Sequence, residues 1–140
     1  MTPRQMSDIV RHQNPLTLPS TTSIQEACRS MRERRVGAVM VTDALGRLAG
    51  IFTGRDGVCR VLAERLDPGR ATLAEVMTRK PDTMPPNKTA IEAMRAMQDG
   101  GYRHLPVVDG EKIVGIVSRG DFRGVEQVRL DDETALWERI

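Results

Sequence analysis

The chain contains one sequence pattern twice, and this repeat limits what it can fold into. Residues 50–56 read GIFTGRD, and residues 115–121, 65 positions later, read GIVSRGD. A strand-like run that ends in aspartate precedes each copy, at residues 37–43 and 103–109. A repeat of this period predicts two copies of one supersecondary unit. The chain fits one compact domain or two small halves. A half of about 60 residues buries only about 60% of its unfolded surface, and two halves packed together would share one larger core.

The first copy predicts the element order β-α-β-β-α over residues 8–66. Within it, an Asn-Pro turn at residues 14–15 comes before the first extended piece, and four hydroxyl residues at 20–23 can cap the helix that follows. We expect a short extended piece at 17–18, a helix from about 24, strands at 38–42 and 47–53, and a helix at 54–66. In that last helix the spacing predicts three inward residues, Val58, Val61 and Leu62.

The second copy predicts the same order over residues 74–125, after a linker at residues 67–73. We expect a short strand at 83–84, a helix at 89–99 that ends at a Gly-Gly pair, strands at 105–108 and 112–118 around an Asp-Gly turn, and a helix after Ser118. A C-terminal helical tail is expected over residues 126–140, in which a helix starts at the acidic residues 131–133 and runs to residue 140. Helices and strands mixed in this way place the chain in the α+β class.

Two cysteines are too few for a disulfide framework. Cys28 and Cys59 both fall on predicted helices among apolar residues. Cys28 continues an apolar helical face that starts at Ile24 and ends at Met31. We expect both cysteines to be small buried hydrophobic residues, with redox chemistry as the alternative.

The repeated order, with a Gly-hydrophobe-x-Ser/Thr-x-x-Asp motif closing each copy, resembles the CBS domain, named after cystathionine β-synthase. The pair resembles a tandem CBS (Bateman) module over residues 8–66 and 74–125. The second copy adds the run LPVVD at residues 105–109, where the first has Met40 in place of Pro106. The resemblance implies two CBS repeats packed as a pseudo-symmetric pair, with adenosine-containing ligands bound in the cleft between them.

Thr53 and Ser118 each stand where a predicted strand meets a predicted helix, with Asp56 and Asp121 three residues later. The first turn of a helix presents unpaired N–H groups and a partial positive charge, which favour a phosphate. A hydroxyl can donate to a phosphate oxygen, and an ionised carboxylate can accept both hydroxyls of a ribose. In CBS proteins the matching residues hold phosphate and ribose, so the resemblance implies that these four residues bind the ligand.

The same four residues also match a capping box, in which a Ser or Thr before a helix exchanges hydrogen bonds with an acidic residue three positions later. The sequence leaves both interpretations open. They are compatible, because a hydroxyl can cap the helix in the empty protein and turn to phosphate when ligand binds.

Four further residues are candidates for ligand binding because of where they lie in the sequence. Arg55 and Arg119 lie in the same first turns, where a cation opposes the helix dipole unless an anion is bound; solvated surface arginines are the alternative. Arg103 and His104 precede the central strand of the second copy, and in some CBS proteins basic residues here reach phosphates. A packed or capping role is the alternative for His104. We expect no metal site, because the only other histidine is His12.

The resemblance also implies that each cleft is completed by the other repeat. The Asp121 site would use residues of the first copy, namely Thr17, Val36 and Gly37. The Asp56 site would use residues of the second copy, namely Thr83, Tyr102 and Arg103.

Composition argues against other classes of protein. A net charge of +2 and an aromatic content of 3% offer little for a base-stacking surface, so nucleic acid is not an expected partner. The sequence has no P-loop motif and no visible catalytic constellation, so we expect no enzyme activity. No apolar run approaches 18 residues, and the N-terminus lacks a signal-peptide segment, so we expect a cytoplasmic protein without a membrane partner.

From the residues and the resemblance together, we expect a stand-alone regulatory sensor of adenine nucleotide and no catalytic cofactor. AMP is the favoured ligand, with ATP, ADP or NAD as rivals. Ligand would act by stabilising one relative geometry of the repeats or of a homodimer. The alternative is a structural dimerisation module with unoccupied pockets that regulates a partner enzyme. The dimer interface would come from the apolar residues of the closing helices, Val58, Val61, Leu62, Phe122 and Val125.

Overall fold

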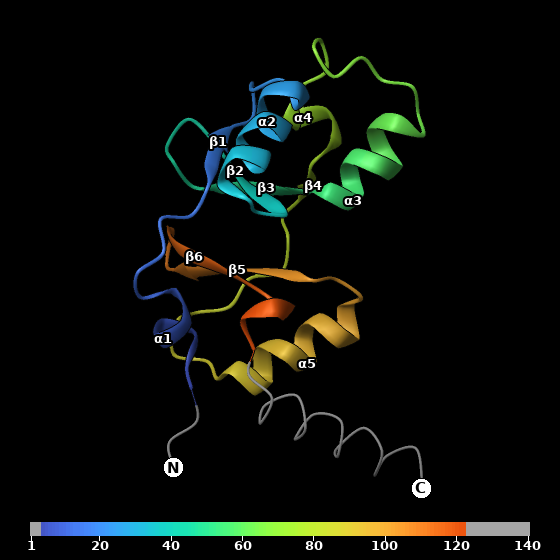
Figure 1. The fold of residues 1–140 in the computed structure, drawn as a ribbon. Coiled ribbons are helices and arrows are strands. Elements are labelled where there is room, and N and C mark those ends of the chain that lie inside the picture. Colours follow the sequence, from blue (N-terminus) through green and yellow to red (C-terminus); the bar gives the residue numbers. More distant parts are fainter. Residues whose placement is uncertain (1–3, 123–140) are drawn as a thin grey trace, which may run out of the picture. The chain divides into compact units, whose positions relative to one another are not determined.

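The computed structural model describes residues 4–122 of the 140-residue chain. These residues form two units, each with its own hydrophobic core. The first-repeat unit comprises residues 14–81 and 111–113, and the second-repeat unit comprises residues 4–13, 82–110 and 114–122 (Figure 1). Val125 and the expected tail helix at 126–140 lie outside the described residues.

A four-stranded sheet in the order β1-β2-β3-β4 lies at the centre of the first-repeat unit. Its strands are β1 (Thr17–Pro19), β2 (Ala38–Thr42), β3 (Leu48–Thr53) and β4 (Thr78–Arg79). β1 runs parallel to β2, whereas β2 pairs with β3, and β3 with β4, in antiparallel fashion. The turn between β2 and β3 places Gly46 at φ 78°, a conformation that glycine adopts without strain. The strands predicted at 38–42 and 47–53 are confirmed.

Helix α2 (Ile24–Arg34) lies against the sheet (Figure 1), and its buried side chains form a narrow apolar stripe. Its N-cap is Ser23, whose hydroxyl accepts a hydrogen bond from the Glu26 amide over 3.1 Å. The buried residues of the helix are Ile24, Ala27 and Met31. Cys28 is exposed, so the prediction that it is buried was wrong. Only positions i, i+3 and i+7 of the helix are buried. Cys28, at i+4, lies at the edge of this stripe.

The helix that follows β3 has two parts, α3 (Gly54–Asp56) and the π-helix η1 (Gly57–Leu62). In η1 the Ala63 amide donates to the carbonyl of Val58 over 3.0 Å, which is the i→i+5 bond of a π-helix. Val61 is 3% exposed and packs into the core, but Val58 is 58% and Leu62 is 72% exposed. The prediction that all three point inward was therefore wrong for two of them, because the wider turn breaks the 3.6-residue period on which it rested.

Cys59 also lies in η1, and it is exposed. The expectation of a buried thiol was wrong here too, since only Val61 of this helix reaches the core.

The second-repeat unit contains strand β5 (His104–Asp109) and all but the first two residues of β6 (Lys112–Ser118), with helix α5 (Ala90–Gly100) and the short 3-10 helix η2 (Arg119–Asp121) (Figure 1). Met84 adds a parallel bridge to Val107, at the position of the predicted strand 83–84. The turn between β5 and β6 places Gly110 at φ 63°, as expected of an Asp-Gly turn.

Both ends of α5 are capped, and the sequence predicts the cap at the C-terminal end. The Thr89 hydroxyl accepts from the Glu92 amide over 3.3 Å, and the Glu92 carboxylate accepts from the Thr89 amide over 2.8 Å. At the other end Gly101 has φ 71°, and its amide donates to the carbonyls of Met97 and Gln98.

The short first helix of each sequence repeat packs into the unit of the other repeat. α1 (Met6–Val10) buries Met6 and Val10 in the second-repeat core, in one cluster with Ala90 and Leu105. α4 (Leu73–Val76) buries Leu73 and Val76 in the first-repeat core, beside Ile24 and Phe52. Backbone bridges mark both junctions, Gln5 with Thr89 and Ser23 with Thr72. Each unit is thus completed by a helix from the other part of the sequence.

Candidate functional site

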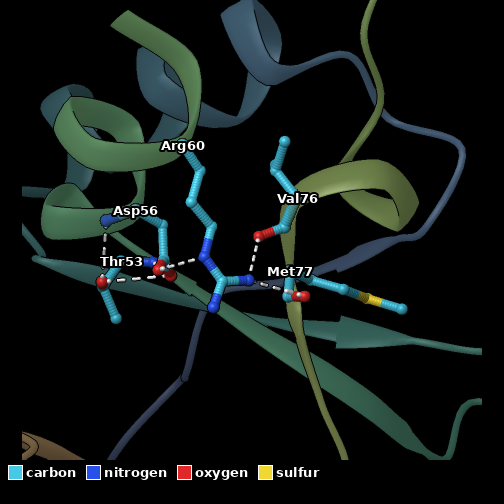
Figure 2. Close-up of polar contacts among 5 residues, drawn as sticks. All are labelled: Thr53, Asp56, Arg60, Val76 and Met77. Atoms are coloured by element: carbon cyan, nitrogen blue, oxygen red, sulfur yellow. Dashed lines mark hydrogen bonds and ion pairs between the residues drawn. The ribbon is translucent and has the colours of Figure 1, made fainter. Parts of the chain in front are cut away.

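Thr53 and Asp56 form a reciprocal pair at the joint between β3 and α3 (Figure 2). The Thr53 amide donates to Oδ2 of Asp56 over 2.9 Å, and the Thr53 hydroxyl donates to the same oxygen over 3.2 Å. In return the Asp56 amide donates to the Thr53 hydroxyl over 3.3 Å. Both side chains are partly buried. This geometry is a capping box, and it fixes where the strand ends and the helix begins.

Ser118 and Asp121 repeat the arrangement at the joint between β6 and η2. The Ser118 amide donates to Oδ2 of Asp121 over 2.7 Å, and its hydroxyl donates to that oxygen over 3.3 Å. Asp121 is exposed, whereas Ser118 is partly buried. The capping interpretation of both motifs is therefore realised in the structure, and their role in ligand binding stays a prediction.

Arg60 extends the first of these pairs, and sequence analysis did not single it out. Its Nε lies 3.6 Å from Oδ1 of Asp56, one turn earlier in the helix. Its Nη1 donates to the carbonyl of Val76 over 3.0 Å and to that of Met77 over 3.3 Å (Figure 2). The i, i+4 spacing of Asp56 and Arg60 was the available signal, but only the fold brings α4 close enough to receive the guanidinium.

The first-repeat unit brings some of the other candidates close to Thr53. The Gly54 amide donates to the Gly37 carbonyl over 3.1 Å, which places Gly37 beside the cap. Val36 is 39% exposed, and Arg55 is exposed. Thr17 is exposed on β1, the edge strand on the other side of β2. Gly37 and Arg55 thus share the Thr53 joint, while Thr17 lies across the sheet from it.

In the second-repeat unit the Arg119 amide donates to the carbonyl of Arg103 over 3.2 Å, so these two residues lie at one strand end. Both side chains are exposed, and Nη2 of Arg119 lies 3.4 Å from the Met97 carbonyl. His104 is partly buried. Burial lowers the pKa of His104, the nearby Asp121 carboxylate raises it in part, and Arg103 adds a further lowering. His104 therefore favours its neutral form beside the cap.

Tyr102 is tied down by a neighbouring acid. Its hydroxyl donates to Oδ2 of Asp82 over 2.9 Å, and its ring packs closely on Gly100. Burial, followed by the hydrogen bond to Asp82, raises the pKa of Tyr102 to about 12. Thr83, next to Asp82, is exposed. Tyr102 is thus a fixed hydrogen-bonding group near the start of β5.

The expected clefts combine residues of both repeats. Residues Thr17, Val36 and Gly37 lie in the first-repeat unit together with Asp56, and residues Thr83, Tyr102 and Arg103 lie in the second-repeat unit together with Asp121. Completion of each site by the other repeat stays a prediction.

Two further observations concern residues 4–122 alone. No helix in this range combines the length and the apolar character that a membrane crossing needs. Nor does this range gather three or more His, Cys, Asp or Glu side chains into a set that could hold a metal ion.

Comparison with known proteins decides the family. The family model for the CBS domain matches twice, at residues 6–58 and 73–126. The chain belongs to the CBS-domain family. Both matches end just beyond the reciprocal Thr/Ser–Asp pairs, so these pairs close the two CBS repeats. CBS-pair proteins are regulatory modules.

Two curated relatives show the extent of the similarity. The CBS domain-containing protein CBSCBSPB3 of Arabidopsis thaliana is 39% identical over 108 residues, which are 77% of this chain and 19% of that protein. The CBS domain-containing protein YhcV of Bacillus subtilis is 36% identical over 105 residues, 75% of this chain and 74% of that protein. This CBS chain therefore spans about a fifth of the plant relative and most of the bacterial one.

Solved structures share the fold. The CBS-domain containing protein ATU1752 from Agrobacterium tumefaciens has a TM-score of 0.77 and 32% identity, covering 84% of this chain and 89% of that one. The CBS domain pair of protein MJ0100, in complex with 5′-methylthioadenosine and S-adenosyl-L-methionine, has a TM-score of 0.77 and 27% identity, covering 95% and 99%. Two CBS repeats of the α+β class are thus the fold of this chain.

Proposed function

We propose that this CBS pair is a regulatory module that binds an adenine nucleotide, with AMP favoured, through Thr53 and Asp56 in one repeat and Ser118 and Asp121 in the other. The observation that carries the proposal is the matched pair of carboxylates at the two strand–helix joints. In each capping box, the aspartate accepts the hydrogen bond from the Thr or Ser amide with Oδ2 alone. The second oxygen, Oδ1, then serves as an acceptor for ribose hydroxyls without loss of the cap.

The choice of ligand class follows from chemistry and from the family. A ribose offers two adjacent donors, which suit an acceptor-only carboxylate, and the hydroxyl of Thr53 or Ser118 suits a phosphate oxygen. The related domain pair of MJ0100 is described in complex with two adenosine-containing molecules. Arg55, Arg119 and Arg103 are exposed cations at the same joints, and they favour a phosphorylated nucleotide over a neutral nucleoside.

Regulation would follow from a population shift. A nucleotide that binds one arrangement of the repeats more tightly than another stabilises that arrangement, and a partner protein reads the change. The module itself then performs no chemistry.

A thermal-shift panel with AMP, ADP, ATP and NAD tests the proposal. At 100-fold excess over Kd, a bound ligand adds about 2.7 kcal/mol to the free energy of unfolding. For a chain of this length that corresponds to a rise of roughly 5–10 °C in Tm. No shift with any of the four nucleotides would count against nucleotide binding.

Association into a homodimer is a second proposal, favoured by two exposed apolar side chains. Val58 is 58% and Leu62 is 72% exposed on the same helix, η1. Burial of such residues at an interface between copies would remove apolar area from water. Sedimentation of the wild-type chain and of a Val58→Asp, Leu62→Asp variant tests it, and a wild-type chain that sediments as a monomer at all concentrations would exclude it.

A further inference from the structure

Arg60 joins the Asp56 carboxylate to a segment that takes no part in the cap. Its guanidinium spans from Oδ1 of Asp56, at 3.6 Å, to the carbonyls of Val76 and Met77, at 3.0 and 3.3 Å (Figure 2). Asp56 is largely shielded, since its side chain is 15% exposed, whereas Arg60 is 48% exposed. The oxygen that the cap leaves to a ligand is therefore the oxygen that faces Arg60.

The segment held by Arg60 connects α4 to β4 and leads out of the first-repeat unit. Met77 is the C-cap of α4, and the next two residues form β4, which pairs with Gly50 and Ile51 of β3. This approach is close, because a Cβ on Gly50 would lie 2.6 Å from Sδ of Met77. The long continuous stretch of this unit, residues 14–81, ends two residues after β4, at Pro81. Arg60 thus holds the start of the exit strand.

The second repeat lacks this arrangement at the level of sequence. Position 125, 65 residues after Arg60, is valine, which carries no charge. Among the described residues, Asp121 forms no ion pair alongside its capping bonds. Before a ligand binds, the Asp56 carboxylate is therefore ion-paired with Arg60, whereas the Asp121 carboxylate has no such pair among the described residues.

We propose that Arg60 is a positioning residue that competes with ligand for Asp56 and so links occupancy of this site to the exit strand. The proposal rests on the proposed nucleotide binding. Ribose hydroxyls that donate to Oδ1 of Asp56 draw it away from Nε of Arg60. An arginine without its carboxylate holds the Val76 and Met77 carbonyls less firmly, and the α4–β4 connection loosens. The Asp121 site fills without this competition, so it binds first.

Titration calorimetry with AMP tests the competition at a single site. Both proteins carry Asp121→Asn, so that binding reports on Asp56 alone. Replacing Arg60 by valine, the residue of the second repeat, is expected to tighten AMP binding about two- to fivefold, because an exposed ion pair contributes little. Arg70→Val is the matched control: Arg70 is 90% exposed and pairs with Asp67, and its loss removes the same charge without touching Asp56.

Hydrogen exchange gives a second readout that a merely structural role would not produce. The Met77 amide donates to Leu73 over 2.8 Å, and the Lys80 amide donates to Ala49 over 3.4 Å. AMP is expected to speed exchange at these amides in the protein that keeps Arg60. In the Arg60→Val protein, exchange is expected to be fast without AMP and to change little when AMP is added.

The outcomes separate this proposal from the proposed function. AMP that binds equally or more weakly after Arg60→Val, or an exchange response that survives the substitution, overturns the role of Arg60 and leaves nucleotide binding intact. AMP that binds neither the wild-type chain nor any variant overturns the proposed function, and the role of Arg60 falls with it.

Discussion

The Ser118 amide donates to the carboxylate of Asp121 over 2.7 Å, and this bond closes the joint between β6 and η2. Thr53 and Asp56 make the same bond at the equivalent joint of the first repeat, over 2.9 Å. The Thr/Ser-x-x-Asp motif, to which the family resemblance gives a role in ligand binding, is thus also a capping box that joins strand to helix. Because the cap uses one carboxylate oxygen, the chain can use the motif for both purposes.

Removing the cap hydroxyl should destabilise the first-repeat unit. Thr53→Ala deletes the acceptor of the Asp56 amide and should lower the free energy of unfolding by about 1 kcal/mol. Thr53→Ser keeps the hydroxyl and should lose less. Urea denaturation of both variants measures the difference, and equal stability of the two variants would contradict a role for the hydroxyl.

A methyl group at Gly50 should be costly, because β3 and Met77 approach closely there. The added Cβ would lie 2.6 Å from Sδ of Met77 and 2.8 Å from the Thr78 carbonyl oxygen. Gly50→Ala should therefore destabilise the protein by about 1–3 kcal/mol. Gly54→Ala is the matched control, since nothing lies within 4 Å of its added Cβ. Equal melting temperatures for the two variants would show that β4 does not pack on β3 as described.

Phe52 should be the residue on which the first-repeat core depends most. Its side chain is 0% exposed and lies in one cluster with Leu73 and Val61. Phe52→Ala should cost about 3–5 kcal/mol. Leu45→Ala, at a residue that is 76% exposed, should change stability by no more than about 0.5 kcal/mol. Chemical denaturation compares the two, and a small effect at Phe52 would contradict this core.

His104 should make stability depend on pH. Burial lowers its pKa below the ordinary value of about 6.5, so the unfolded chain binds the proton more readily. The contribution of neutral His104 to the free energy of unfolding is therefore fully present above about pH 6.5. It is lost as the pH falls through the pKa of His104 in the folded protein. His104→Gln should reduce the loss of unfolding free energy between about pH 7.5 and pH 5.5. His12→Gln, at an exposed histidine, should retain the wild-type loss; an identical loss in both variants would rule out His104 as the cause.

Sequence patterns predicted the local structure where one physical signal dominates. The Gly-rich end of α5, with Gly101 at φ 71°, and the Asp-Gly turn at Gly110 follow from backbone sterics alone. The strand ends at Thr53 and Ser118 follow from capping chemistry, which is local as well.

The errors came from an irregular helix and from long-range packing. Period counting assumes an α-helix, so it placed Val58 and Leu62 inward, but η1 is a π-helix and exposes both. Arg60 was missed because its partners Val76 and Met77 lie 16 and 17 residues away in sequence. The packing of α1 and α4 into the other repeat's unit likewise leaves no local signal, since an amphipathic helix can dock on either core.

Calorimetric titration of AMP into the wild-type chain and into the Asp56→Asn, Asp121→Asn variant tests nucleotide binding most directly. Asparagine keeps a carbonyl oxygen for the cap, but its amide nitrogen cannot accept a ribose hydroxyl. The wild-type chain should release or absorb heat on binding, and the double variant should show none while unfolding at nearly the same temperature. Equal binding by both proteins, or no binding by the wild-type chain, would contradict the assignment of these two carboxylates to a nucleotide site.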